Sequence, residues 1–416
     1  MESLFVLSCL MVTPLTSIDD NATGDAAPFS ALGVNAALCS VLESKIGITQ
    51  CAPVQEKVIP LLLTRKNLIF TSETGTGKTL AYLLPLLSHI LSKPLPPKSN
   101  IRLLTLAPTF ELASQIKKNI ALLMPEAKHA LLIGSAPLKR QMETLKEKPV
   151  SVTGTPARIL ELIQLKKLKF APDCALVLDE VDRLFSPELR DTVRDVVESC
   201  HSGESSAMQV VACSATINES AKKILTGWIG DTAFAQMPIQ NILQDNIEHH
   251  ALFSESREKL DTLRKYLAAS QPKKALIFTS RLVDVEKIAS FLRSKKYACA
   301  ALHSKTEKTA RKTAMDGFIS GKYSILVTSD LASRGLDILN ISHVIQLDLP
   351  QDADFFVHRA GRTGRLNAGL KKFDKNGINI VIGDEREMRR YAQLEKQLGI
   401  KVFPKELRGG AVESAG

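Results

Sequence analysis

The chain has 416 residues, 44% hydrophobic and 24% charged, with a formal net charge of +10 and a pI of about 9.2. These fractions are typical of a globular protein, and the length allows two domains with separate cores. The charge suits a polyanionic partner, although a basic surface alone does not identify one. The seven cysteines show no C-x-x-C pair and no zinc spacing, which favours reduced thiols in an intracellular protein.

The N-terminal segment contains an apolar run at residues 4–12. It is shorter than the roughly 18 apolar residues that a membrane-spanning helix needs. The first basic residue is Lys45, so the basic region of a signal peptide is missing. We therefore expect residues 1–25 to be a tail, and the protein to be cytoplasmic and without membrane contact.

Short apolar runs alternate with amphipathic stretches through both halves of the chain, which predicts βα units on parallel sheets. Strands are predicted at residues 67–71, 102–107, 129–133, 151–153, 175–179 and 208–214, and then at 275–279, 298–302, 324–328, 343–347 and 378–382. The polar stretch that ends at residue 248 is the expected linker. The predicted domains are therefore 26–238 and 249–407, joined by 239–248 and followed by a disordered tail at 408–416.

The glycine-rich segment 72–79 lies between an apolar strand pattern and an apolar helical pattern at 80–91. This is the context of a P-loop, in which backbone N–H groups and a helix N-terminus point at phosphates. Lys78 is expected at the β- and γ-phosphates and the Thr79 hydroxyl at Mg²⁺. Ser72 replaces the first glycine of the strict pattern, so the match is to a variant. The predicted phosphate-binding residues are Ser72, Thr74, Gly75, Thr76, Gly77, Lys78 and Thr79.

A second apolar strand pattern ends in the carboxylates Asp179, Glu180 and Asp182. Asp179 is placed to hold Mg²⁺ through its water shell, and Glu180 to orient an attacking water. An acidic strand end alone is more often a solvated loop, but the P-loop in the same half favours the functional interpretation. Arg362 and Arg365, on a glycine-rich turn in the second half, are suited to reach a phosphate from another domain.

Taken in order, these segments resemble the motifs of the DEAD-box ATP-dependent RNA helicases of helicase superfamily two. Residues 47–55 are similar to the Q motif, 72–79 to motif I, 179–182 to motif II and 214–216 to motif III. Residues 276–279, 328–337 and 358–365 are similar to motifs IV, V and VI. The resemblance extends from about residue 29 to residue 382, and seven motifs in order make chance an inadequate explanation.

The resemblance implies an α/β fold of two tandem RecA-like domains, each a mostly parallel sheet flanked by helices, with ATP and Mg²⁺ in the cleft between them. It implies that Gln55 selects adenine, with Phe29 near the position of the stacking aromatic but one residue further upstream than expected. Gly335 and Asp337 would approach the ribose and phosphates, and Arg362 and Arg365 would act as arginine fingers. The residues that would link the ATP state to the RNA grip are Asp182, Ser214, Thr216 and His358.

RNA would lie across both domains of a monomer. The implied contacts are Pro108, Thr109, Thr155, Pro156, Arg158, Thr279, Arg311, Thr328 and Asp330. The departures from the family pattern gather on this side of the protein: they are Phe110, Ser135, Ala157 and Lys308. Contacts of this kind go mainly to phosphates and 2′-hydroxyls, so we expect binding that tolerates sequence and weakens with salt.

Three hypotheses follow. The first is ATP-driven closure of the two domains on an RNA duplex, which opens a few base pairs or remodels an RNA–protein complex. The second is an ATP-gated RNA clamp or ribosome-assembly factor with little unwinding, which the altered RNA-side motifs favour somewhat. The third is a DNA helicase of the same superfamily, against which Gln55 and the compact core argue.

Overall fold

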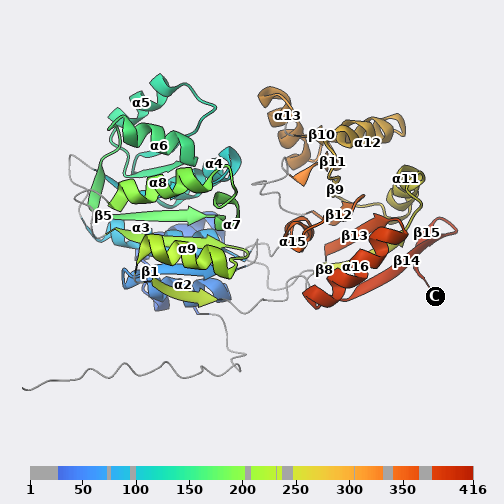
Figure 1. Cartoon of the computed structure of the whole chain (residues 1–416), viewed down its shortest axis with the longest axis horizontal. Helices are drawn as coiled ribbons and strands as arrows, with labels where there is room; N and C mark the ends of the chain where they lie inside the picture. The colour runs from blue at the N-terminus through green and yellow to red at the C-terminus, as the bar shows by residue number, and fades with distance from the viewer. Residues whose placement is uncertain are drawn as a thin grey trace, which may run out of the picture.

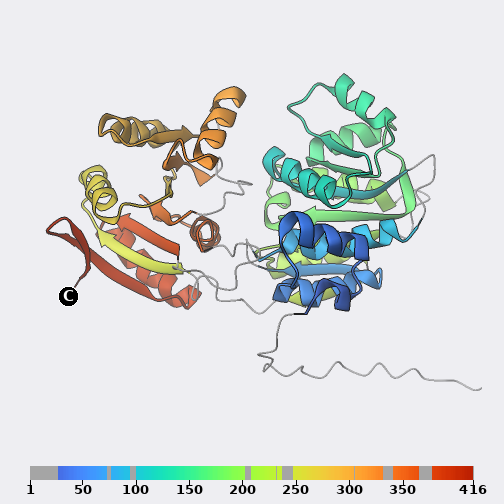
Figure 2. The same ribbon diagram turned by 180° about the vertical axis from the view of Figure 1, so that it is seen from behind.

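The computed structural model describes residues 27–72, 76–93, 100–201, 208–230, 232–236, 247–303, 305–330, 341–364 and 377–415. Two α/β domains lie side by side, the first running from η1 to β7 and the second from β8 to β15 (Figures 1 and 2). Each has a sheet dominated by parallel strands and flanked by helices, which confirms the predicted fold class.

Within the described residues, the first sheet has seven parallel strands in the order β3-β4-β2-β5-β6-β1-β7. Successive side chains of a strand point to opposite faces, so the apolar runs supply both faces with core residues. In β1, Leu68 and Phe70 belong to one apolar cluster and Ile69 to the other. The strands are β1 (Asn67–Thr71), β2 (Ile101–Leu106), β3 (His129–Leu132), β4 (Ser151–Gly154), β5 (Phe170–Asp179), β6 (Gln209–Ser214) and β7 (Thr232–Gln236).

Helices cover both faces of this sheet. One cluster joins it to α1 (Ala36–Val41), α2 (Pro53–Leu63), α3 (Lys78–Leu91) and α4 (Phe110–Leu123), with the short turns η1 (Phe29–Leu32) and η2 (Leu42–Ile46) beside them. The other cluster joins it to α6 (Pro156–Gln164), α7 (Val181–Leu184), α8 (Arg190–His201) and α9 (Glu219–Ile229). Helix α5 (Leu138–Lys146) packs at the β3 edge.

The second sheet has, among the described residues, eight strands in the order β10-β11-β9-β12-β13-β8-β14-β15, of which only β15 runs antiparallel to its neighbour. Its strands are β8 (Ile247–Phe253), β9 (Ala275–Phe278), β10 (Cys299–Leu302), β11 (Ile325–Thr328), β12 (His343–Gln346), β13 (Gly377–Gly383), β14 (Val402–Arg408) and β15 (Ala411–Ser414). Its helices are α11 (Lys259–Ser270), α12 (Leu282–Ser294), α13 (Lys308–Ile319), α15 (Ala353–Ala360) and α16 (Glu385–Leu398). Helices α13 and α15 lie on the side that faces the first domain (Figures 1 and 2).

The predicted disordered tail at 408–416 is wrong for its described part. Gly409 and Gly410 both have positive φ, at 55° and 82°, and form a two-residue turn between β14 and β15. A Gly-Gly pair suits such a turn because its backbone twist matches that of the paired strands. The predicted linker also ends too late, since Ile247 and Glu248 belong to β8. Residues 239–246 of that linker and the predicted tail 1–25 lie outside the described residues.

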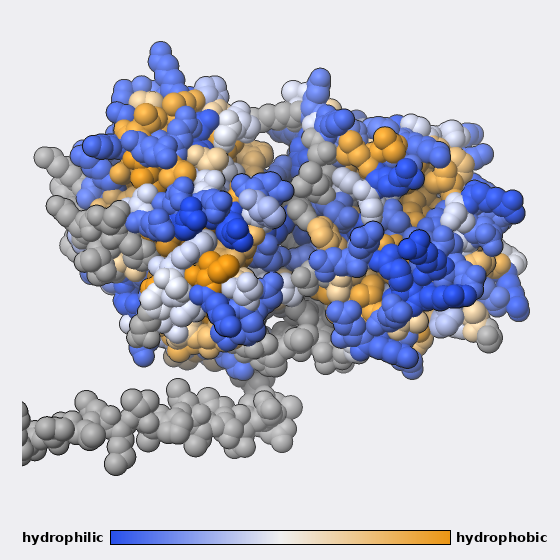
Figure 3. All heavy atoms as spheres, viewed as in Figure 1, coloured by the Kyte–Doolittle hydropathy of each residue, from blue (hydrophilic) through white to orange (hydrophobic). Residues whose placement is uncertain are grey.

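Among the helices that the structure describes, none combines the length and the apolar character needed to cross a membrane. Figure 3 shows the face of the molecule that is seen in Figure 1. Hydrophilic side chains are spread over both domains on this face, and apolar side chains form scattered groups. The six cysteines in the described parts, Cys39, Cys51, Cys174, Cys200, Cys213 and Cys299, are all free thiols.

Candidate active site between the two domains

The strand order of the first sheet brings the sequence motifs together at one edge. Strands β5, β6 and β1 are neighbours, with Asp179 in register with Cys213 and Thr71 with Ser214. Because the strands are parallel, their carboxyl ends meet at the same edge, where ligands of open α/β sheets bind. The Ser72 N–H donates to the Ser214 carbonyl at 3.0 Å, which fixes the start of the glycine-rich loop.

The described part of this loop is held by Gln55 and closed by Gly77. The Gln55 amide accepts from the Ala52 N–H at 2.8 Å and donates to the Gly77 carbonyl at 3.2 Å. Gly77 has a φ of +96°, and a Cβ at this position would lie 2.4 Å from Gln55 Nε2. A side chain at this position would therefore strain the backbone and would also displace the end of the Gln55 side chain. Thr74 and Gly75 lie outside the described residues.

The polar side chains of the loop face one another. The Ser72 and Thr76 hydroxyls are 2.7 Å apart, and both residues are buried. The Lys78 ammonium donates to the Ser72 carbonyl at 2.5 Å. Burial lowers the pKa of Lys78, and the neighbouring thiol of Cys213 and the carboxylate of Asp179 oppose this change. The loop thus concentrates hydroxyl, N–H and ammonium donors that suit phosphate oxygens.

Asp179 ends β5 as a carboxylate that is 3% exposed and held by three donors. One oxygen accepts from the Tyr82 hydroxyl at 2.8 Å, and the other accepts from the Cys213 thiol at 3.2 Å and the Glu180 N–H at 2.9 Å. Burial raises the pKa of Asp179, and the charge of Glu180 adds to this effect. Lys78 and the Tyr82 and Cys213 hydrogen bonds act in the opposite direction. Sequence analysis missed Tyr82 and Cys213, whose contacts with Asp179 depend on the strand order.

The donor set fits Mg²⁺ bound together with phosphates. Asp179 offers a buried carboxylate, and Thr79 follows Lys78 at the start of α3. The described residues contain no group of three or more His, Cys, Asp or Glu that would form a closed metal cage. Mg²⁺ usually keeps several waters and takes one or two protein oxygens plus phosphate oxygens, so two protein ligands suffice.

Glu180 begins the turn into α7 with a left-handed backbone, at φ 56° and ψ 59°. Its carboxylate forms a close ion pair with Arg183, one turn further along. Arg183 was not among the predicted site residues. A non-glycine residue in this backbone region is uncommon and occurs often at functional sites, which agrees with the role predicted for Glu180.

The second domain reaches this site through α15. His358 Nε2 lies 3.4 Å from one Asp182 oxygen, and the Ser214 hydroxyl donates to the other at 2.6 Å. Burial raises the pKa of Asp182, but the hydrogen bonds from His358 and Ser214 outweigh it, so the net pKa lies below its usual range. Three of the four predicted coupling residues therefore meet in one chain of contacts. The fourth, Thr216, lies two residues beyond the end of β6.

Arg362 follows α15 and is 8% exposed, and its Nε donates to the His358 carbonyl at 3.2 Å. It therefore lies beside the residue that contacts Asp182 of the first domain. Its predicted partner Arg365, and the predicted ribose and phosphate contacts Gly335 and Asp337, lie outside the described residues.

Arg359 is the centre of polar contacts in the second domain, and sequence analysis did not assign it. Its guanidinium, 1% exposed, is ion-paired with Asp330 at 2.5 and 2.7 Å and donates to the Asp348 carbonyl at 2.8 Å and the Ser280 hydroxyl at 2.9 Å. This network ties the ends of β9, β11 and β12 to α15. Asp330, which was predicted to contact RNA, is instead occupied by Arg359, because a buried guanidinium requires a charged partner.

Two of the remaining RNA-side predictions in the second domain, Thr279 and Thr328, lie at the carboxyl ends of the neighbouring strands β9 and β11. Thr279 and Thr328 are buried, and the Thr279 hydroxyl donates to Asp348 at 2.9 Å. Arg311, on α13, forms an ion pair with Glu111 of α4 in the first domain, with Nη2 and Oε1 2.8 Å apart. The side chain of Lys308 lies outside the described part of the chain.

In the first domain the predicted RNA contacts begin α4 and α6. The Thr109 hydroxyl caps α4 by accepting from the Leu112 N–H at 3.3 Å, directly after Pro108. Thr155 is the N-cap residue of α6 after β4 but makes no capping hydrogen bond with its side chain, and Pro156 occupies the first turn. Two of the departures from the family pattern, Phe110 and Ala157, follow at the starts of the same two helices.

Arg158 is engaged within the first domain. Its guanidinium donates to the Gly134 and Ala136 carbonyls at 3.1 and 3.0 Å. These hydrogen bonds stabilise the loop that contains Ser135, another departure from the family pattern.

Phe29, the predicted adenine-stacking residue, is 2% exposed and belongs to the core cluster of the first domain. Phe29 is the first residue of η1 and follows Pro28, which forms an isolated antiparallel β-bridge with Gln50. The burial gives the ring a packing role and does not support stacking against a nucleotide base.

Comparison with known proteins identifies the class to which this arrangement belongs. Residues 52–224 match the DEAD/DEAH box helicase family, and residues 258–367 match the helicase conserved C-terminal domain. The DEAD-box ATP-dependent RNA helicase CshC of Bacillus cereus is 36% identical over 377 residues, which cover 89% of this chain and 92% of CshC. The probable ATP-dependent RNA helicase YfmL of Bacillus subtilis is 33% identical over 88% of this chain and 94% of its own.

The fold comparison agrees. The structure of S. cerevisiae Dbp5 bound to RNA and ADP BeF3 has a TM-score of 0.77 at 24% identity, covering 91% of this chain and 96% of the chain in that structure. The chain therefore belongs to the DEAD-box helicase family.

Proposed function

We propose that the protein is an ATP-dependent RNA helicase that couples RNA-stimulated hydrolysis of ATP to ADP and phosphate to local unwinding or remodelling of RNA. One observation carries this proposal. Motif VI of the second domain touches motif II of the first through His358 and Asp182, at the edge where the P-loop lies. ATP hydrolysis and the relative position of the domains can thus influence each other at one place.

The first domain supplies the groups for hydrolysis. Gln55 selects adenine, Lys78 and the loop N–H groups bind the phosphates, and Glu180 orients the attacking water. Thr79 and Asp179 would hold Mg²⁺, which neutralises charge that develops on the phosphates. Arg362, together with Arg365, stabilises the γ-phosphate from the second domain.

Closure of the domains couples hydrolysis to RNA. A full switch between open and closed states needs about 5.5 kcal/mol of differential binding. In this proposal the His358–Asp182 pair, the Arg311–Glu111 pair and the arginine contacts to the γ-phosphate are lost when the domains open, and so they contribute to this difference. RNA bound across both domains favours the same state and is bent by it, so a few base pairs open. We propose contacts to the RNA backbone that are largely independent of sequence.

The proposal is tested by phosphate release and by unwinding of a short RNA duplex. We expect Lys78→Ala to abolish turnover. We expect Arg362→Ala to bind a fluorescent ATP analogue normally but to lose RNA-stimulated hydrolysis about 10³-fold, the lower end for an arginine finger. Wild-type turnover in either variant would contradict the assignment, and stimulation by DNA as strong as by RNA would favour a DNA helicase.

A second candidate function is an ATP-gated RNA clamp or assembly factor with little unwinding. The contacts of Arg158 and Arg311 favour it, since both predicted RNA-binding guanidinium groups are engaged with protein oxygens. RNA-stimulated hydrolysis without strand separation, measured side by side on the same duplex, would support the clamp over the helicase.

The proposal includes a cytoplasmic monomer. Six free thiols in the described residues agree with a reducing compartment. Cell fractionation tests the location, and light scattering at assay concentrations tests the monomeric state.

A further inference from the structure

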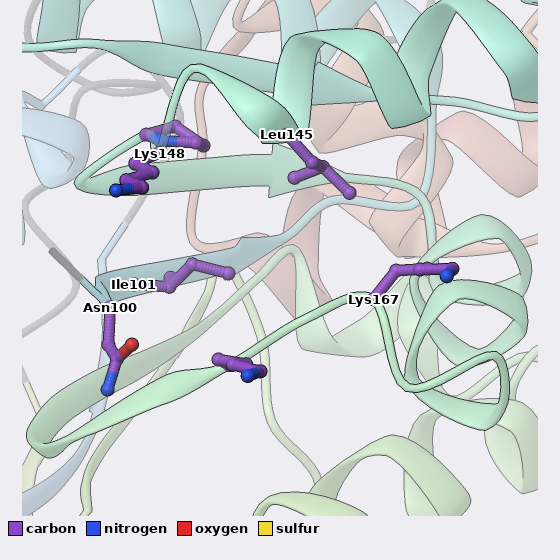
Figure 4. A pocket seen from close by; sticks show the side chains of 7 residues that line it. Asn100, Ile101, Leu145, Lys148 and Lys167 are labelled. Carbon is purple, nitrogen blue, oxygen red and sulfur yellow. The ribbon is translucent and has the colours of Figure 1, made fainter. Parts of the chain in front are cut away.

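A hollow of about 300 Å³ lies at the end of the first sheet that is opposite the active site (Figure 4). Its apolar part is formed by Ile101, which begins β2, by Pro149, which precedes β4, and by Leu145 of α5. In Figure 4, Lys148 and Lys167 come from two different loops and flank Ile101 and Leu145.

Polar groups complete the lining. They are the side chains of Asn100, Lys148, Lys167 and Lys169. Lys148 follows α5, whereas Lys167 and Lys169 lie between α6 and β5, so two separate turns supply three lysines to the lining.

The surrounding segment carries most of the excess charge of the chain. Residues 128–169 contain nine Lys and Arg but three Asp and Glu, which is six of the net ten positive charges. Each of these three carboxylates lies beside a cation that does not line the hollow: Glu143 pairs with Lys146 at 2.8 Å, Glu147 with Lys128 at 3.8 Å, and Glu161 with Arg158 at 2.8 Å.

The negative C-terminal ends of the nearby helices do not neutralise this positive charge. Helices α5 and α6 both end beside the hollow, and each C-terminus carries roughly half a negative charge. Together these amount to about one unit, against three ammonium groups. The residues that line the hollow thus bring three positive charges and no carboxylate, around an apolar floor.

We propose that this hollow binds the phosphodiester backbone of an RNA strand that extends beyond the active-site cleft. This rests on the proposed function. The lysines would contact phosphates, the Asn100 amide a 2′-hydroxyl, and the apolar floor the face of a ribose. The hollow adds an anchor that holds the substrate on the first domain while the second domain opens and closes.

The position of the hollow separates it from the cleft. Thr109 and Thr155, predicted to contact RNA, lie just past the carboxyl ends of β2 and β4, whereas the hollow lies at their amino ends. Six residues of β2 span about 20 Å. A strand that fills only the cleft does not reach the hollow, and a longer strand does.

The experiment compares two labelled RNAs in the full-length protein with an ATP analogue: a short strand that fills the cleft, and the same strand with extensions at both ends. The test variant is Lys148→Gln/Lys167→Gln/Lys169→Gln. The matched control is Lys295→Gln/Lys296→Gln/Lys401→Gln in the second domain. Lys296 has a left-handed backbone like Lys148, with φ of 68° and 54°, so the change in charge and in backbone context is matched.

For the test variant we expect the log–log salt slope of extended-strand binding to fall by about 2, since each single-strand phosphate contact contributes roughly 0.7. Binding of the short strand should be unchanged, as should both strands with the control variant. Thermal unfolding of each variant verifies that it is folded.

Extended-strand binding equal to wild type in the test variant would overturn the inference while leaving the proposed function intact. Equal weakening of both strands would also overturn it, because the lysines would then act only through net charge. Binding of a poly-glutamate peptide, lost in the test variant, without any effect on the extended strand would assign the hollow to an acidic protein instead. Failure of the wild-type protein to bind even the short strand would instead contradict the proposed function.

Discussion

His358 of the second domain lies 3.4 Å from Asp182 of the first, and Ser214 donates to the other oxygen of that carboxylate at 2.6 Å. Asp182 lies three residues after Asp179, the predicted Mg²⁺ ligand, and Ser214 is in register with the strand that leads into the P-loop. A movement of the second domain would therefore act directly on residues next to the proposed nucleotide site.

We expect His358→Ala to lower RNA-stimulated hydrolysis about tenfold, which corresponds to about 1.4 kcal/mol for a partly buried, charge-assisted contact. Affinity for ATP should change little, because the residues proposed to bind the phosphates belong mainly to the first domain. The measurement is turnover at saturating RNA, with ATP binding followed separately.

The chain offers a matched control for this variant. His89 and Asp173 also lie 3.4 Å apart with similar exposure, but both belong to the first domain. His89→Ala should leave turnover at the wild-type level. Equal losses in the two variants would show that the His358 effect is not specific to the domain contact.

The Arg311–Glu111 pair is a second contact between the domains, and Arg311 was predicted to bind RNA as well. Partly exposed ion pairs are worth up to about 1 kcal/mol, so Glu111→Gln should weaken ATP-dependent RNA binding a few-fold. Arg311→Ala should weaken it more, because an RNA contact is lost in addition.

The double charge reversal Glu111→Arg/Arg311→Glu separates these two effects. It should regain the contact between the domains, measured by the distance between fluorophores on the two domains with an ATP analogue, but not the RNA affinity. Full recovery of RNA affinity would mean that Arg311 acts only through Glu111.

Much of the fold was predictable because central strands of parallel sheets are continuous apolar runs. Strands β1, β5 and β9, for example, were all located from such runs. Strand β8 was missed because His249 and His250, both buried, break its apolar pattern. Strands β7, β14 and β15 were also missed. Strands β7 and β15 are at the edges of their sheets, and β14 and β15 carry mixed or polar residues.

The motifs of the site were found from local pattern, but the contacts between them were not. Tyr82 and Asp179 are 97 residues apart, and Arg359 and Asp330 are 29 apart. Each pair meets only because the strand order places their elements together. No local periodicity carries that information, which is why Tyr82, Cys213 and Arg359 were not predicted.

Tyr82 orients Asp179, and its removal should raise the requirement for Mg²⁺. In Tyr82→Phe the Asp179 carboxylate loses a 2.8 Å hydrogen bond that favours its charged form. We expect the Mg²⁺ concentration for half-maximal hydrolysis to rise about tenfold, the lower end for groups that orient a metal ligand. Tyr391→Phe, a buried tyrosine of the second domain, is the control and should leave this concentration unchanged.

The same variant should change the pH dependence of hydrolysis. Burial already raises the pKa of Asp179, and the lost hydrogen bond raises it further. Because the carboxylate must be ionised to serve Mg²⁺, the acidic limb of the pH–rate profile should move to higher pH. An unshifted limb combined with normal Mg²⁺ dependence would show that Tyr82 only packs.

His343 links the stability of the second domain to pH. Burial, and then the nearby His250, lower the pKa of His343 from 6.5 to about 4. The folded state therefore binds fewer protons than the unfolded state between these values, so stability is complete above pH 6.5 and falls as the pH drops toward 4. Between pH 7.5 and 5 this amounts to a loss of about 2 kcal/mol from this residue.

Urea unfolding at the two pH values, followed by a probe in the second domain, measures this loss. His343→Asn should lose about 2 kcal/mol less than wild type over the same interval, whatever its stability at pH 7.5. Ser342→Ala removes the hydroxyl that lies 3.0 Å from His343 Nδ1 but keeps the titrating ring, so it should retain the wild-type pH dependence. Identical pH dependence in wild type and His343→Asn would mean that His343 takes up a proton in the folded domain as readily as in the unfolded chain, in contradiction to its burial.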